Sequence, residues 1–255
     1  MKLNKIIVIV SFVISNINSV FATGQIPDYL IIEKDTLSLH CNPLENYFQK
    51  NPIPNDLIKV TSSALWRGYI AYFKIVDNKL IVENIYKQDI QNPEKGVFKE
   101  ELISIYKDIF GDKPNFECDF DGVLICPKGK QISYVHMGYS STYEKYLLIE
   151  IKNGNYIREK EFSDEEYTNL KLKHFKKYQQ SEEYKKALNE TIAMFKETEK
   201  NLEKDFKEIK RENDKRKKQN KYLYEKEKEL EYLQSAENFL FFVTTNNIKT
   251  IDIPN

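Results

Sequence analysis

The sequence predicts an α+β protein: a body of mostly antiparallel strands with one or two short helices, a long charged helical (coiled-coil-like) arm, and a C-terminal β-hairpin. Short alternating runs of apolar residues, separated by turn residues, fill the first two thirds of the chain, as in an antiparallel sheet. From Asp164 to Gln234 there is no glycine and no proline, and charged residues dominate. We therefore expect a body at 23–163, a helical arm or helical hairpin at 164–238, and a hairpin at 239–255 that rejoins the body.

The first 22 residues have the pattern of a secretory signal peptide. Lys2 and Lys5 precede an apolar run from Ile6 to Ile14, and Val20 and Ala22 stand at the small-residue positions before a cleavage site. The alternative is a membrane anchor, for which the run is short, because a spanning helix needs roughly 20 apolar residues. We predict export to a periplasmic or extracellular location, with no integral membrane segment after cleavage.

The charge balance argues against one class of partner. The chain carries 39 Lys and Arg against 39 Asp and Glu, and two of the bases lie in the leader. A near-neutral chain offers no global attraction to nucleic acid or to an anionic membrane. We expect no nucleic-acid partner.

Metal ligands are not grouped in the sequence. There is no C-x-x-C motif, and the three histidines are scattered at His40, His136 and His174. A structural zinc site needs a closely spaced set of such ligands. We expect neither a metal nor another cofactor.

The three cysteines allow one disulfide. Cys118 and Cys126 flank an expected turn at Asp121-Gly122, and opposed positions on a hairpin lie within disulfide range. This pairing would leave Cys41 free or intermolecular. The alternatives pair Cys41 with one of the other two, or leave all three reduced.

Turn residues mark two hairpins in the body. From Tyr69 to Ile75, successive side chains alternate between the two faces of an expected strand. Asp77-Asn78 is the expected turn, and Leu80 to Ile85 form the returning strand. Both faces of this hairpin are apolar, so we expect it inside the sheet. Asn153-Gly154 is the strongest turn signal in the chain. Between the two hairpins, Val97 to Gly111 has the apolar spacing of an amphipathic helix.

Ser163 and Glu166 form a capping box that opens the helical arm. The seven-residue recurrence that follows predicts an apolar seam with a polar break at Arg216, and its members are Leu188, Phe195, Leu202, Ile209, Leu223 and Leu230. The arm is then one long helix, or two helices folded back near 213–220. Beyond it, Phe239 to Val243 is too apolar to remain free and predicts the C-terminal hairpin, turning at Asn246-Asn247.

The stretch from Ile132 to Ile151 is the first candidate site. His136, Tyr139, Tyr143 and Glu144 flank a Ser-Ser-Thr loop. Nucleophilic catalysis needs Ser, His and an acid in mutual hydrogen-bond geometry, and no G-x-S-x-G elbow is present. We assign no catalytic residue here; the alternatives are a binding surface and a structural loop.

Trp66 and Arg67 form the second candidate, because Trp and Arg are common anchors of binding surfaces. The structural alternative places Trp66 at the sheet edge and pairs Arg67 with an acid inside the fold. Gly68 and Gly138 each permit close packing beside large aromatic rings. We therefore expect Trp66 and Arg67 to lie close to His136 and Tyr139.

The segments "ALWRGYIAYFKIVDNKLIVENI" and "GKQISYVHMGYSSTYEKYLLIEIKNG" resemble bacterial proteins that share the pattern W-R-G-Y…G-K…Y-V-H-M-G-Y-x-S-x-Y-E, over Leu37 to Ile157. This family has no known function, so the resemblance implies no catalytic residue. It implies that Ser163 to Asn238 is an addition to a shared body. It also implies that Trp66, Arg67, Gly68, His136 and Tyr139 act as one unit.

Two functions remain in view. The first is an exported, non-enzymatic interaction protein, accessory or immunity-like, that binds another protein or a second copy of itself through the helical arm. The alternative is an exported hydrolase acting on a cell-wall, glycan or peptide substrate, which requires a deep pocket containing His136 or Glu144.

Overall fold

The computed structural model describes residues 24–60, 62–91 and 99–252. The predicted signal peptide lies outside these residues. The chain forms two compact units: residues up to Tyr167 together with Lys249–Asp252, and Thr168–Ile248. The fold class is α+β, as the sequence predicts.

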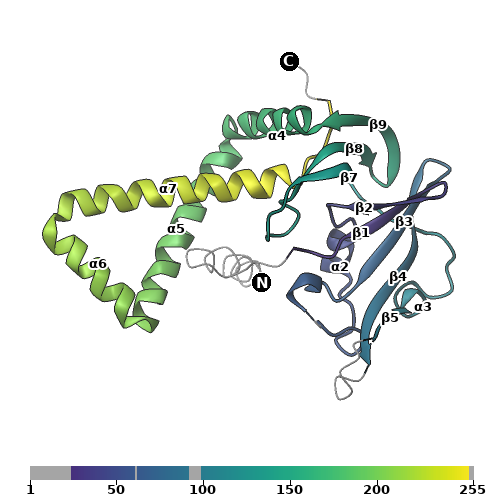
Figure 1. Cartoon of the computed structure of the whole chain (residues 1–255), viewed down its shortest axis with the longest axis horizontal. Coiled ribbons are helices and arrows are strands. Elements are labelled where there is room, and N and C mark those ends of the chain that lie inside the picture. The colour runs from purple at the N-terminus through teal and green to yellow at the C-terminus, as the bar shows by residue number, and fades with distance from the viewer. Residues whose placement is uncertain (1–23, 61, 92–98, 253–255) are drawn as a thin grey trace. The chain divides into compact units, whose positions relative to one another are not determined.

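The first unit, here called the body, is a nine-stranded sheet (Figure 1). Its strands are β1 Asp28–Ile32, β2 Asp35–Leu39, β3 Ile70–Val76, β4 Lys79–Gln91, β5 Lys99–Ser104, β6 Phe116–Glu117, β7 Gly122–Ser133, β8 Thr142–Lys152 and β9 Asn155–Ser163. The spatial order is β2-β1-β3-β4-β9-β8-β7, with β5 and β6 paired to β4. All pairs are antiparallel except β1 with β3. The two ends of the order meet, because the backbone N–H of His40 after β2 donates to the carbonyl of Ile125 in β7 at 2.8 Å.

The predicted hairpins have the expected turns. Asp77 and Asn78 have φ of 48° and 62° between β3 and β4, and Asn153 and Gly154 have φ of 49° and 74° between β8 and β9. Both pairs are therefore in the left-handed region that two-residue hairpin turns of this type require. A Cβ at Gly154 would lie 2.8 Å from the carbonyl oxygen of Cys118, so glycine is also needed there for space. As predicted, β3 is internal, with Phe73 fully buried.

The helix expected from Val97 to Gly111 is wrong over most of its length. Residues 99–104 form β5 against β4, and only Tyr106–Phe110 form a helix, α3. Val97 lies outside the described residues. The free edge of β4 supplies hydrogen-bond partners that a sequence pattern cannot reveal, and pairing with it overrides local helix propensity. Two other short segments complete the body, α2 Glu45–Lys50 and the 3₁₀ turn η2 Ser63–Leu65.

Four helices make up the arm: α4 Asp164–Gln179, α5 Glu182–Asp205, α6 Lys207–Gln219 and α7 Lys221–Thr245. The predicted capping box opens α4, with Glu166 Oε2 accepting from the Ser163 N–H at 2.8 Å and Ser163 Oγ accepting from the Glu166 N–H at 3.2 Å. The arm is not one long helix, because the chain breaks at Phe206 and again at Asn220, whose side chain caps α7. In Figure 1, α5, α6 and α7 form the three sides of a triangle.

The predicted C-terminal β-hairpin is wrong. Phe239 to Thr245 continue α7, and Leu240 packs with Phe175 of α4 and Tyr184 of α5. Packing against other helices buries Leu240 and partly buries Phe239 and Phe241, and this tertiary contact decides the structure. The chain does return to the body, at Lys249–Asp252, but without forming a strand.

Candidate functional site

Arg67 lies at the centre of a buried polar cluster in the body. Its side chain is 1% exposed, and its Nη2 lies 3.3 Å from Asp28 Oδ1 and donates to the carbonyl of Ile26 at 3.0 Å. Its Nη1 donates to the hydroxyl of Tyr139 at 3.2 Å. The contact between Arg67 and Tyr139 confirms the expectation that their two motifs meet. The acid inside the fold that the structural alternative required for Arg67 is Asp28.

Asp28 was missed by sequence reasoning. It begins β1, is fully buried, and its Oδ1 also accepts from the backbone N–H of Ala71 at 2.9 Å. Burial raises the pKa of its carboxyl to about 6, against the opposing effect of Arg67. Asp28 Oδ2, Arg67 Nε and the Tyr69 hydroxyl are buried and make no hydrogen bond within the described residues. The available signal was an acid directly before the apolar run of a strand, a position where burial demands a cation.

Tyr139 joins the loop after β7 to this cluster. Its hydroxyl donates to Asn42 Oδ1 at 3.0 Å, and its ring stacks on His40 at 4.9 Å between centroids. His40 also meets the edge of Tyr143 at 5.5 Å. Burial lowers the pKa of His40 to about 4. The neutral imidazole therefore acts as a flat aromatic surface between two tyrosines.

The other predicted site residues lie apart from the cluster. Trp66 is 49% exposed, although it neighbours Arg67 in sequence. His136 is exposed and packs against Tyr134 at 5.3 Å between centroids. Glu144 Oε2 accepts from the backbone N–H of Lys130 at 2.9 Å, which fixes the β7–β8 bulge. Of the six candidates, the structure brings Arg67 against Tyr139, and Tyr139 and Tyr143 against His40.

The cysteines do not form the predicted hairpin pair. All three are free and buried. The premise of the Cys118–Cys126 pairing is wrong, because Phe116–Glu117 pair with β4 and not with β7. Burial raises the pKa of Cys41 and of Cys118 to about 12, and that of Cys126 further. Protonated thiols of this kind are poor nucleophiles.

One open polar pocket of about 430 Å³ lies elsewhere in the body. Its lining residues are Asn46, Gln49, Lys50, Asp119, Asp121, Asn153 and Lys249. None of the sequence-predicted site residues lines it. Over the described ranges, no group of three or more His, Cys, Asp or Glu is arranged to hold a metal ion. Within the same part of the chain, no helix has the length and hydropathy to cross a membrane.

A polar cluster lies between α5, α6 and α7, beside the apolar core of the helical unit. Glu199 of α5 accepts from Asn213 of α6 at 3.1 Å, from Lys228 of α7 at 2.7 Å, and from the hydroxyl of Tyr232. Burial alone would raise the pKa of Glu199, but these donors hold it below its ordinary value. Lys196 and Glu229 add a second α5–α7 ion pair at 2.6 Å. Charged groups therefore hold the three helices together at this level.

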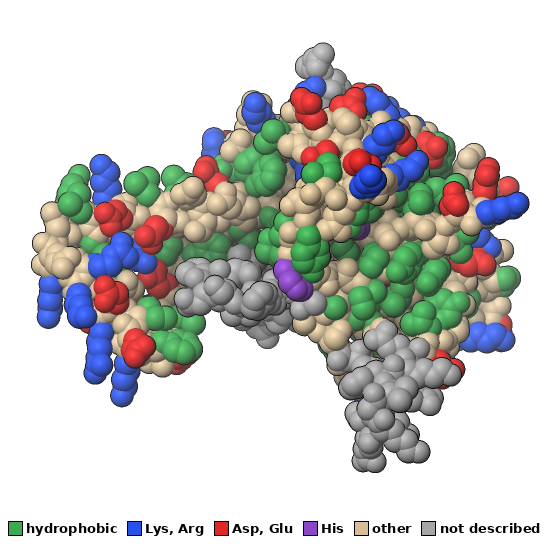
Figure 2. Space-filling model, in the orientation of Figure 1, with side chains coloured by type: hydrophobic (Ala, Val, Ile, Leu, Met, Phe, Trp, Pro, Cys, Tyr) green, Lys and Arg blue, Asp and Glu red, His purple; other side chains and the backbone are tan. Residues whose placement is uncertain are grey.

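Apolar side chains on α6, on α7 and at Phe206 between α5 and α6 point to solvent. We call them the arm surface: Phe206, Ile209, Tyr222, Leu223, Leu230 and Leu233, whose exposed fractions run from 37% to 73%. Figure 2 shows hydrophobic side chains at the surface of these helices, among many charged ones. The predicted seven-residue seam is thus divided: Phe195 is 8% exposed, whereas Leu230 is 57% exposed.

No protein-family model, no curated protein and no solved structure matches this chain. The resemblance carried by the two motifs therefore stays an expectation.

Replacing Arg67 with alanine should destabilise the body strongly, because it leaves the Asp28 carboxylate buried without a neutralising cation. We expect a loss of about 3–5 kcal/mol in the free energy of unfolding. Urea unfolding followed by the fluorescence of Trp66, the only tryptophan, reports on the body. The control is Lys107→Ala, which removes an ion pair to Asp112 whose side chains are 83% and 92% exposed, and it should change little. Equal effects of the two substitutions would contradict a structural role for Arg67.

His40 should make the body sensitive to acid. Its pKa is lower in the folded state (about 4) than in the unfolded state (about 6.5), so the unfolded chain binds the proton first. The stability that neutral His40 contributes is present above about pH 6.5 and is lost as the pH falls toward about 4. His40→Phe keeps a ring against Tyr139 and removes this titration.

The wild type should therefore lose stability more steeply than His40→Phe between pH 6.5 and 4, measured by urea unfolding at several pH values. Asp28 acts in the opposite direction, because its raised pKa makes the folded state bind the proton first between about pH 6 and 3.8. Since Asp28 is present in both proteins, its effect cancels in the comparison. Parallel curves would show that His40 does not titrate as described.

Proposed function

We propose that this chain is an exported, non-enzymatic interaction protein, whose helical unit binds another protein or a second copy of the chain. The observation that carries the proposal is the arm surface. Large apolar side chains face solvent on α6, on α7 and at Phe206 between α5 and α6, while a carboxylate with three hydrogen-bond donors lies between the three helices. An apolar core around Phe175, Tyr184 and Leu240 stabilises the helices, and the arm surface lies outside that core, on faces that a helical unit normally leaves polar.

The energetics support the same proposal. Burying an exposed leucine contributes roughly 1.5–3 kcal/mol, and large exposed apolar groups rimmed by charged residues are typical of interaction sites. Leu223 and Leu230 lie seven residues apart on α7 and so share one face of the helix. A partner that covers this face would gain apolar burial that the folded chain itself leaves unused.

The hydrolase alternative receives less support. It required His136 or Glu144 to converge with other titratable groups in a deep pocket. In the described part of the chain, His136 is exposed beside Tyr134, and the 430 Å³ pocket is lined by neither residue. The buried Arg67 cluster is closed to substrates, because Arg67 is 5% exposed and Asp28 0%.

Site-specific photo-cross-linking in the cells that produce the full chain tests the proposal. A photoreactive residue in place of Leu230 should give discrete adducts of higher mass, either with another protein or with a second copy. The matched control is Leu172 of α4, which is 41% exposed and outside the arm surface, and it should give none. Equal labelling at Leu230 and Leu172, or no adduct at Leu230 and at Leu223, would refute a binding role for this surface.

A further inference from the structure

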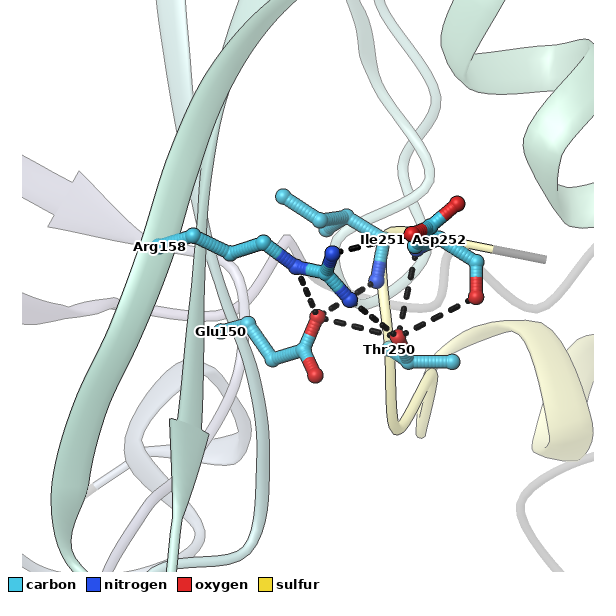
Figure 3. Close-up of polar contacts among 5 residues, drawn as sticks. All are labelled: Glu150, Arg158, Thr250, Ile251 and Asp252. Atoms are coloured by element: carbon cyan, nitrogen blue, oxygen red, sulfur yellow. Dashed lines mark hydrogen bonds and ion pairs between the residues drawn. The ribbon is translucent and has the colours of Figure 1, made fainter. Parts of the chain in front are cut away.

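The segment Lys249–Asp252 is held on the body by a network of side chains rather than by a strand ladder. In sequence, the segment comes after α7 and therefore after the whole helical unit. It contacts β8 and β9 of the body. Figure 3 shows Thr250, Ile251 and Asp252 converging on Glu150 and Arg158. Two neighbouring strands therefore present one acid and one base to a short extended segment.

Glu150 of β8 recognises the backbone and the hydroxyl of this segment. Its Oε2 accepts from Thr250 Oγ1 at 2.9 Å and from the backbone N–H of Ile251 at 3.1 Å. The same oxygen accepts from Arg158 Nε at 3.0 Å. Glu150 is 8% exposed, so these donors replace the water that its carboxylate would otherwise bind.

Arg158 of β9 recognises the acid. Its Nη1 donates to Asp252 Oδ2 at 2.9 Å, and its Nη2 donates to Thr250 Oγ1 at 3.3 Å. The planar guanidinium thus spans two positions of the segment. Lys249 adds a contact from its Nζ to the carbonyl of Asp121. The specific features are a threonine hydroxyl, the following backbone N–H, and a carboxylate two residues after the threonine.

We propose that Glu150 and Arg158 form a peptide-recognition site for Thr-x-Asp sequences, and that the chain's own residues 250–252 occupy it as a releasable strap. The Arg158–Asp252 ion pair is more exposed than the Glu150 carboxylate. The side chains of Arg158 and Asp252 are 42% and 66% exposed, whereas that of Glu150 is 11% exposed. Partly exposed hydrogen bonds are individually weak, and the covalent link keeps the local concentration of the strap high. A peptide with the same three features competes for the same donors and acceptor. This site contains no residue of the arm surface, so it does not depend on the proposed function.

Hydrogen exchange of the full chain tests the strap directly, because the amide of Ile251 donates to Glu150. Glu150→Gln should speed exchange at Ile251 about tenfold or more, since the charged acceptor is lost. The matched control is Glu161→Gln, which removes a glutamate paired with Lys128 and Lys145 on the same sheet and should leave Ile251 unchanged. Equal exchange at Ile251 in the wild type and in Glu150→Gln would overturn the contact.

Competition tests whether the site recognises a peptide. A synthetic peptide of residues 249–255 in millimolar excess should speed exchange at Ile251 of the intact protein, and the same peptide with Thr250→Val should not. The Glu150→Gln protein should show no further response to the peptide. If the peptide changes nothing in the wild type at any concentration up to several millimolar, or if the Thr250→Val peptide acts equally, the proposal is wrong.

Discussion

The ion pair between Arg67 and Asp28 is the constraint on which the body depends. β1 and β3 are parallel, so no hairpin turn sets their register. Tyr29 of β1 pairs with Tyr72 of β3. Asp28 Oδ1 accepts from the N–H of Ala71, one residue earlier, so this bond extends the β1–β3 pairing by one residue. Arg67 then makes the buried carboxylate tolerable. The same guanidinium contacts Tyr139, which joins the loop after β7 to the opposite end of the strand order.

Local chemistry explains which parts of the fold the sequence could predict. The turns at Asp77-Asn78 and Asn153-Gly154 and the cap at Ser163 depend on residues within four positions of one another, and all three form as expected. The β5 strand and the helical end of α7 depend on partners distant in sequence, namely the free edge of β4 and the rings of Phe175 and Tyr184. Apolar spacing alone cannot distinguish these outcomes.

The candidate site was half predictable for the same reason. Arg67 and Tyr139 carry recognisable motifs, and a buried arginine must find an acid. The place of Asp28 directly before the apolar run of β1 was a signal, but it does not single out Asp28 as that acid among 39 acidic residues. Glu199 is harder still, because its burial follows only from the crossing of α5, α6 and α7. A heptad frame continued through Arg216 assigns Phe195 and Leu230 to one seam, yet the break at Asn220 turns Leu230 outward.

The two arginine clusters of the body perform the same task at different strengths. Arg67 supports the pairing of β1 with β3, which no hairpin turn links, and Arg158 holds Lys249–Asp252 on β8 and β9. Each guanidinium bridges a carboxylate and a hydroxyl. Their burial differs, at 1% and 42% of the side chain. Removing a partner from the first leaves a charge without water, which costs about 3–5 kcal/mol. In the Arg158 cluster, water can replace the ion pair between Arg158 and Asp252, because such an exposed pair contributes roughly 0–1 kcal/mol. Exposure thus separates a permanent closure of the sheet from a contact that can open while the sheet stays folded.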